Sequence, residues 1–544
     1  MASISTSSSI SDSDDSTIDS DQDTGVALDQ DTILKQLEEE DNRAVETTTM
    51  EFIRSDFEQI RDKPKCPWWL WLLLGIIALL ILALAIGLGL GLKTTNLGVS
   101  VFECGVENEE GIVYRVYVES FTKTSNFDGV KNKLDYIKNL GTKYIVLSQG
   151  FANELTQSVD FLEINEAKSG TWEQFQDLTQ AAGEKGMRVL IELNIISTTF
   201  DSEIFDRSMF VADRNKTTYF PYFPCSPQMH SNSSDTFLCI NSFDRPVLNA
   251  SNENVKSKYK DILEKWMEHG ACGFFLHDMD LVYTDPKGKE VGPNKKLLND
   301  VKEVVDKTED AIIIADIGGQ EIYATESIEE LYSLGAQMVL GYKMTSLSHW
   351  FSGNVNFTWM ETFFREDNNL IKNKKEIPFF ITGGQTLYAT SENEKKSYPS
   401  MFLLAFTLPG TPIITAGEEY GRIGSIGSQF DWERAKNNEM TDLIQKLAKI
   451  RTTKSLTKFD ESYLENNETT RTLSIYRSSA SGLKYHTMIN LDSQRQNVTL
   501  KCSEGVLQDF VLVSNRTLTN TRDKCTNDTV FNLEPLESIF VYEK

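Results

Sequence analysis

Eight short apolar runs, most of them rich in β-branched residues, alternate with helical patterns in the middle of the chain. The runs are Val113–Val118, Tyr144–Leu147, Val189–Leu193, Gly273–His277, Ile312–Asp316, Met338–Tyr342, Pro378–Thr382 and Pro412–Thr415. Apolar residues recur at helical spacing between them, for example over Phe127–Leu140 and Asn254–His269. Parallel strands need long crossovers, usually helical, so this alternation predicts an α/β fold, a closed (β/α)8 TIM barrel over residues 111–453.

Two regions depart from this alternation. The connection over about residues 200–252 is too long for a plain loop, and its two cysteines, Cys225 and Cys239, predict a small disulfide-tied insertion after the third strand. Beyond the helical pattern Thr441–Ile450, short strands follow one another without helices. This pattern predicts a C-terminal antiparallel β domain over residues 454–544.

One apolar segment, residues 67–92, is long enough at 1.5 Å per residue to cross about 30 Å of hydrocarbon. Four basic residues lie shortly before it and Lys93 lies directly after it, so the positive-inside bias predicts a cytosolic N-terminus. We expect a single-pass type II membrane protein. Its cytosolic tail, residues 1–66, is largely disordered with short juxtamembrane helices, and residues 93–110 form a stalk. A cleaved signal peptide is the competing interpretation of the apolar segment.

All potential N-glycosylation sequons lie on the C-terminal side of this segment, as expected if that side enters the secretory lumen. They are Asn215, Asn232, Asn249, Asn356, Asn467, Asn497, Asn515 and Asn527. The formal charge of -26 argues against nucleic acid as a partner, because phosphate binding requires clustered lysine and arginine.

Six of the seven cysteines follow the apolar segment and would face an oxidising compartment. The natural pairs are Cys225 with Cys239 and Cys502 with Cys525, although a sequence leaves the connectivity open. Cys272 precedes an apolar strand and is interpreted as a small buried residue. Cys104 lies in the stalk, where an unpaired, exposed thiol indicates an intermolecular disulfide.

Several segments closely resemble the α-amylase family. They are Tyr114–Phe121, Phe127–Gly129 and Lys133–Gly141 around the first strand and helix, and Phe406–Pro412 and Gly417–Gly421 around the eighth strand. These segments bracket the predicted barrel, so the resemblance covers nearly all of the chain beyond the stalk. It implies the fold strongly and the activity weakly.

Family members that hydrolyse glycosides need a nucleophilic carboxylate on strand four, an acid/base on strand five and a third carboxylate after strand seven. Here the nucleophile position is His277, the family's arginine is replaced by Phe275, and Asp278 comes one residue late. On strand five Asp316 replaces the family's glutamate, and after strand seven Gln385 stands in place of the aspartate. We therefore expect degenerate catalytic positions and no enzymatic activity.

No cofactor and no metal are expected. The family's calcium-binding region aligns with Glu192 and then Ile196–Ser197, which lacks the asparagine oxygen that commonly helps to hold calcium. The histidines show no zinc-binding spacing; they are His230, His269, His277, His349 and His486. His277 could act as a general base, but a structural role is the preferred interpretation.

An anchored, glycosylated chain with a degenerate amylase-like ectodomain resembles the heavy subunits of heteromeric amino-acid transporters, solute carrier family 3. The resemblance implies a non-catalytic subunit that brings a multi-span light subunit to the plasma membrane and supports amino-acid transport. By position, it implies that Cys104 forms the intersubunit disulfide. In the membrane segment, Ala83, Gly87 and Gly91 recur every four residues and could form a contact face for a partner helix.

Two other functions remain open at this point. One is a membrane-anchored α-glucosidase that uses Asp278 and Asp316 in an atypical geometry. The other is a cell-surface adhesion scaffold, for which no motif is distinctive.

Overall fold

The computed structural model describes much of the chain beyond residue 102. The described ranges are 103–106, 110–148, 164, 166–200, 202, 204–212, 222–225, 236–240, 245–277, 279, 283–284, 290–291, 295–316, 324–340, 361, 378–381, 392–422, 428–454, 461–478, 484–500, 507–513, 522–524 and 528–543. No helix in these ranges is both long enough and apolar enough to cross a membrane. The predicted tail, membrane segment and contact face (Ala83, Gly87, Gly91) lie outside the described residues.

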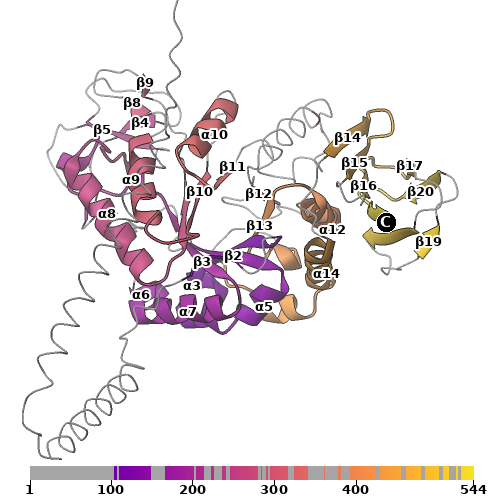
Figure 1. The fold of residues 1–544 in the computed structure, drawn as a ribbon, viewed down its shortest axis with the longest axis horizontal. Coiled ribbons are helices and arrows are strands. Elements are labelled where there is room, and N and C mark those ends of the chain that lie inside the picture. Colours follow the sequence, from indigo (N-terminus) through magenta and orange to yellow (C-terminus); the bar gives the residue numbers. More distant parts are fainter. Residues whose placement is uncertain are drawn as a thin grey trace, which may run out of the picture. The chain divides into compact units, whose positions relative to one another are not determined.

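Eight parallel strands form the central sheet, and they follow one another around it in chain order (Figure 1). They are β1 (Ile112–Tyr117), β2 (Thr142–Ser148), β3 (Arg188–Leu193), β7 (Gly273–Leu276), β10 (Ile312–Asp316), β11 (Met338–Leu340), β12 (Pro378–Phe380) and β13 (Thr411–Thr415). β1 pairs with both β2 and β13, and β11 contacts β12, so the sheet closes. The eight predicted strands and the TIM-barrel fold are confirmed.

The barrel strands are mainly apolar, and the polar residues among them, such as Arg115 and Glu192, are buried as well. Every residue of β1, β2 and β10 is buried, as expected for strands covered by side chains on both faces. Gly273 begins β7 at a φ of 124°, and a Cβ atom there would lie 1.8 Å from the carbonyl oxygen of Ile312. Only glycine allows β7 to approach β10 this closely.

Helices connect the strands and cover the barrel (Figure 1). The α-helices are α3 (Val118–Phe121), α4 (Phe127–Lys131), α5 (Leu134–Asn139), α6 (Glu166–Ser169), α7 (Trp172–Glu184), α8 (Glu253–Glu268), α9 (Lys295–Val305), α10 (Ala324–Ser333), α12 (Glu392–Thr407), α13 (Trp432–Lys436) and α14 (Glu439–Lys454), and the 3-10 helices are η3 (Arg207–Met209) and η6 (Glu418–Tyr420). The helix predicted over Phe127–Leu140 is divided into α4 and α5, although its apolar residues are buried as the spacing predicts.

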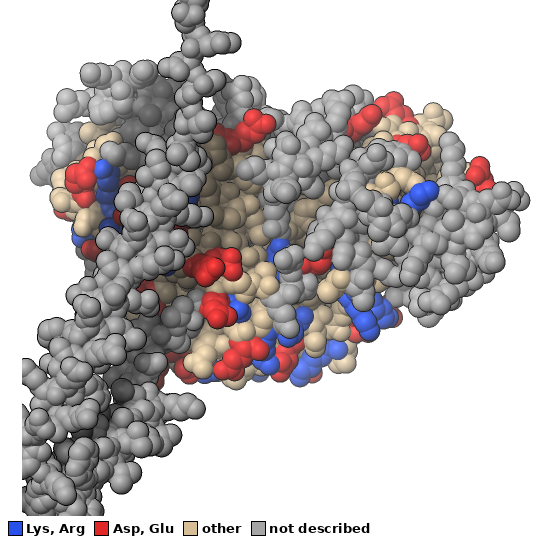
Figure 2. Space-filling view, viewed as in Figure 1, with Lys and Arg blue, Asp and Glu red and all other residues tan. Residues whose placement is uncertain are grey.

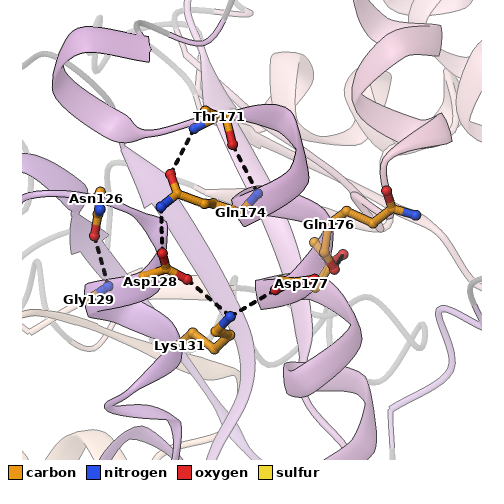
Figure 3. Close-up of polar contacts among 9 residues, drawn as sticks. Asn126, Asp128, Gly129, Lys131, Thr171, Gln174, Gln176 and Asp177 are labelled. Atoms are coloured by element: carbon orange, nitrogen blue, oxygen red, sulfur yellow. Dashed lines mark hydrogen bonds and ion pairs between the residues drawn. The ribbon is translucent and has the colours of Figure 1, made fainter.

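Polar contacts hold α4 against α7 (Figure 3). Lys131 Nζ on α4 lies 3.0 Å from Asp128 Oδ1 and 2.9 Å from Asp177 Oδ2 on α7. Gln174 Nε2 donates to Asp128 Oδ2, and the same glutamine forms a capping box with Thr171 at the start of α7. These groups are partly exposed, so they contribute more to the orientation of the two helices than to stability.

A small insertion follows the third barrel strand, as predicted. Strands β4 (Tyr222–Cys225), β5 (Phe237–Ile240) and β6 (Arg245–Pro246) form an antiparallel sheet, and Cys225 is bonded to Cys239 across it. Between β7 and α9, strands β8 (Tyr283–Thr284) and β9 (Glu290–Val291) form a two-stranded sheet.

The C-terminal region contains two antiparallel sheets. The larger has the order β14-β15-β16-β21-β18-β19, and β17 pairs with β20 in the smaller. Their bounds are β14 (Glu461–Asn467), β15 (Thr472–Ser478), β16 (Lys484–Asn490), β17 (Gln496–Leu500), β18 (Leu507–Val513), β19 (Arg522–Lys524), β20 (Thr529–Leu533) and β21 (Ser538–Glu543). Hydroxyl contacts join this region to α12: Ser538 Oγ donates to Ser400 Oγ at 2.9 Å, and Thr487 Oγ1 donates to Thr407 Oγ1 at 2.9 Å.

The structure corrects the prediction for Cys104. Its sulfur is bonded to that of Cys272 at 2.10 Å, and both residues are buried, with 1% and 2% of their surface exposed. Cys272 lies directly before β7, and its Cα is 5.3 Å from that of Cys104. Cys104 is therefore neither exposed nor available for an intersubunit bond, and Cys272 is a disulfide partner as well as a buried residue. The predicted pair Cys502 and Cys525 lies outside the described residues.

Candidate functional site

Four polar side chains, on or directly after four barrel strands, meet inside the barrel. Arg115 lies on β1, Glu192 on β3 and Asp316 at the end of β10, and His277 directly follows β7. Their exposed fractions are 1%, 3%, 1% and 6%, respectively. The carboxyl ends of barrel strands are where TIM-barrel enzymes place their catalytic groups, so this is the region to compare with a glycosidase. We call these four residues the buried charge cluster.

Glu192 and His277 link the cluster. Arg115 Nε donates to Glu192 Oε2 at 2.7 Å, and Arg115 Nη2 contacts Glu192 Oε1, which gives a bidentate pair. Nε2 of His277 lies 2.6 Å from the same Oε1 atom, and its Nδ1 lies 3.0 Å from Asp316 Oδ2. When both ring nitrogens carry protons, the imidazolium donates to a carboxyl group on each side.

The electrostatics favour this protonated ring. Burial alone would lower the pKa of His277, but the neighbouring Glu192 and Asp316 outweigh it and raise that pKa to about 9. Burial alone would raise the pKa of Glu192, yet Arg115 and His277 lower it to about 2. Against the opposing effect of burial, Glu192 raises the pKa of Arg115 above its ordinary value. Two buried cations thus face two carboxyl groups, and the cluster is close to electroneutral.

This arrangement differs from that of a retaining glycosidase. Such an enzyme needs a free carboxylate nucleophile and a second carboxyl group about 5 to 5.5 Å away, across the scissile bond. At the nucleophile position stands His277, an imidazole in place of a carboxylate, and both of its ring nitrogens face carboxyl oxygens. At the acid/base position Asp316 is buried and bonded to that ring.

Aromatic rings enclose the cluster. The ring of Phe275, at the family's arginine position, meets that of His277 edge to face at 4.9 Å. The guanidinium carbon of Arg115 lies 4.9 Å from the ring centre of Tyr117 and 5.9 Å from that of Phe380. An apolar enclosure strengthens the ion pairs by excluding water.

The structure brings together two of the predicted positions, His277 and Asp316. Asp278 and Gln385 lie outside the described residues. Glu192 was predicted only as part of a vacant calcium region; the structure shows that Arg115 and His277 occupy its oxygens. In the described ranges, no group of three or more His, Cys, Asp or Glu side chains could hold a metal ion.

Sequence reasoning missed Arg115 as a member of the cluster. The signal was present, because an arginine in the middle of an apolar strand must be paired when buried. The pattern alone does not identify the partner, since Glu192 is 77 residues away along the chain.

A second buried acid follows the eighth strand. Glu419 on η6 accepts from Tyr114 Oη at 2.7 Å, from Tyr136 Oη at 2.9 Å and from the backbone nitrogen of Gly417 at 2.7 Å. Burial raises the pKa of this carboxyl group, although the hydrogen bonds oppose the shift. These contacts connect the two family-like segments at the ends of the barrel sequence.

Three of the predicted glycosylation sites fall on described residues. Asn467 and Asn497 are exposed, whereas Asn249 is half-buried. The others, Asn215, Asn232, Asn356, Asn515 and Asn527, lie outside the described ranges.

On the face shown in Figure 2, the basic side chains of the described residues lie among acidic ones.

Relatives include enzymes and a transporter subunit at similar identity. The chain is 24% identical over 354 residues to glucan 1,6-alpha-glucosidase of Streptococcus dysgalactiae subsp. equisimilis, covering 57% of the chain and 64% of the relative. It is 26% identical over 383 residues to the human amino acid transporter heavy chain SLC3A1, covering 58% and 54%. The matched part thus spans less than two thirds of each of these relatives.

The fold comparison agrees with the barrel. A crystal structure of an Anoxybacillus alpha-amylase superimposes with a TM-score of 0.63 at 16% identity, covering 80% of this chain and 98% of that chain. The family model for the alpha amylase catalytic domain matches residues 115–497, which is more than half of the chain. The chain therefore belongs to the alpha-amylase catalytic domain family.

Proposed function

We propose that this protein is a non-catalytic, membrane-anchored member of the family that acts as the heavy, ancillary subunit of an amino-acid transporter. It would bring a multi-span light subunit to the plasma membrane, with its N-terminus cytosolic and its barrel extracellular. The barrel would then serve as a folded ectodomain and not as an enzyme.

The buried charge cluster is the observation that carries this proposal. A protonated His277 stands where a nucleophilic carboxylate would be required, and its hydrogen bond engages Asp316. Glu192, the nearest other acid of the cluster, is held by Arg115. Each of the four side chains thus contacts at least one other member of the cluster, which suits a structural core better than bond cleavage.

Two further points favour a transporter subunit among non-catalytic functions. The relatives include amino acid transporter heavy chains, and the sequence predicts one membrane segment followed by every sequon. The association does not use Cys104, whose sulfur is bonded to Cys272. We expect the two subunits to associate through non-covalent contacts.

Depletion of the chain in the cells that express it tests this function. Uptake of radiolabelled leucine and arginine should fall, and re-expression of the wild-type chain should restore it. A Cys104→Ser, Cys272→Ser chain that still reaches the surface should restore uptake as well. If depleted and control cells take up both amino acids equally, the transporter assignment is wrong for these substrates.

An α-glucosidase is the second candidate, because glucosidases are as similar to the chain as the transporter subunits are and because strand five keeps an acid, Asp316. Incubation of the purified chain with maltose and with a chromogenic α-glucoside separates the two candidates. Turnover by the wild-type protein that is lost in Asp316→Asn would establish the enzyme and reject the non-catalytic proposal.

A further inference from the structure

Strand β17 carries a sequon in a position suited to modification. Along Asn497, Val498 and Thr499, the first and third residues are exposed, whereas Val498 is 5% exposed and packs in a small apolar cluster. Because successive side chains of a strand point to opposite faces, the asparagine and the threonine share the solvent face. The folded strand therefore leaves both recognition residues of the sequon accessible.

The contacts of Asn497 leave room for a sugar on its nitrogen. Its Oδ1 atom accepts a hydrogen bond from Asn532 Nδ2 at 2.9 Å, across the pair β17 and β20. A glycan is attached to the other atom of the amide, Nδ2. The observed bond therefore holds the side chain in place through an atom that glycosylation does not use.

An apolar side chain lies beside this asparagine on the same face. Val530 on β20 is 58% exposed, and it is the large hydrophobic residue with the greatest exposure in the part of the chain that the structure describes. It pairs with Thr499, while Asn532 pairs with Asn497. Val530 is thus diagonal to Asn497, and such neighbours have Cα atoms about 7 to 8 Å apart, within reach of the first sugar ring.

We propose that Asn497 carries an N-linked glycan whose first sugars cover Val530. The bond that forms joins Nδ2 to the anomeric carbon of N-acetylglucosamine. The bond from that carbon to the diphosphate of a lipid-linked oligosaccharide breaks, the lipid diphosphate leaves with the electron pair, and Nδ2 loses one proton. The inference rests on the luminal topology contained in the proposed function.

Occupancy is tested on the full chain expressed in cells with a secretory pathway. After enzymatic removal of glycans, peptide mass spectrometry should find aspartate at position 497, and Asn497→Gln should remove one glycan from the intact mass. Asn467 is the matched control, since it is also an exposed sequon of this region. If Asn467 is modified and Asn497 is not, this inference fails while the topology stands; if no sequon is modified, both fail.

Coverage is tested by placing a thiol at the valine. A maleimide should label Val530→Cys several-fold more slowly in the glycosylated chain than in the same chain with Asn497→Gln. The Asn467→Gln substitution should leave the slow rate unchanged. Equal labelling rates with and without the glycan at Asn497 would overturn the proposed contact.

Discussion

Removal of the disulfide between Cys104 and Cys272 should destabilise the folded unit and leave its subunit assembly intact. The two cysteines are 168 residues apart. In the chain-entropy description, closing a loop of this length in the unfolded state contributes about 5 kcal/mol to stability. With an unfolding entropy of about 2.1 cal/mol/K per residue over roughly 440 residues, the Cys104→Ser, Cys272→Ser protein should melt about 5 °C lower.

The assay is thermal unfolding of the purified full chain, followed by tryptophan fluorescence at one scan rate for all variants. The pair Cys225 and Cys239 provides a matched control, because its 14-residue separation predicts a smaller contribution, about 3 kcal/mol. Peptide mapping without reduction should recover Cys104 joined to Cys272. A peptide joining Cys104 to another protein, or a melting temperature unchanged in the double variant, would refute the reasoning.

Three further outcomes follow from the buried acids. Arg115→Met should destabilise the fold by about 3 to 5 kcal/mol because Glu192 would lose its main counter-charge, and the double variant with Glu192→Met should recover part of this loss in urea unfolding. The pKa of His277 is raised from 6.5 to about 9, so its stabilising contribution is complete below pH 6.5 and is lost as pH rises through 9. His277→Gln should flatten this decline in the free energy of unfolding between pH 6.5 and 9. An unchanged slope would contradict the assignment. Tyr114→Phe removes one of two phenolic donors to Glu419 and should lower the unfolding free energy by about 1 to 3 kcal/mol, whereas a change below 0.5 kcal/mol would show that the bond is dispensable.

The barrel was predictable from the sequence because its strands are buried on both faces. A strand such as Ile312–Asp316 is therefore apolar up to its last residue, and such a run can be recognised in the sequence. Some strands of the C-terminal region are harder to recognise in the sequence for the opposite reason. β14 and β19 are the edge strands of the larger sheet and contain mostly polar residues, and β20 alternates exposed and half-buried positions.

The site was predictable only in part. The positions of His277 and Asp316 followed from the family resemblance, and the structure brings the two side chains together. Two distant pairings were not predictable: Cys104 with Cys272, and Arg115 with Glu192. Each joins residues on different strands or segments far apart in the chain, and no local pattern specifies which distant residue will be the partner.

The position of His277 between two acids also limits which residues can replace it. A single His277→Asp substitution would place three acidic side chains around Arg115 in a space closed to water. Such an uncompensated negative charge is strongly unfavourable, so this substitution alone should lower the stability of the fold. A carboxylate at position 277 would therefore need a compensating change elsewhere in the cluster, so the residues around Arg115 constrain one another as a set.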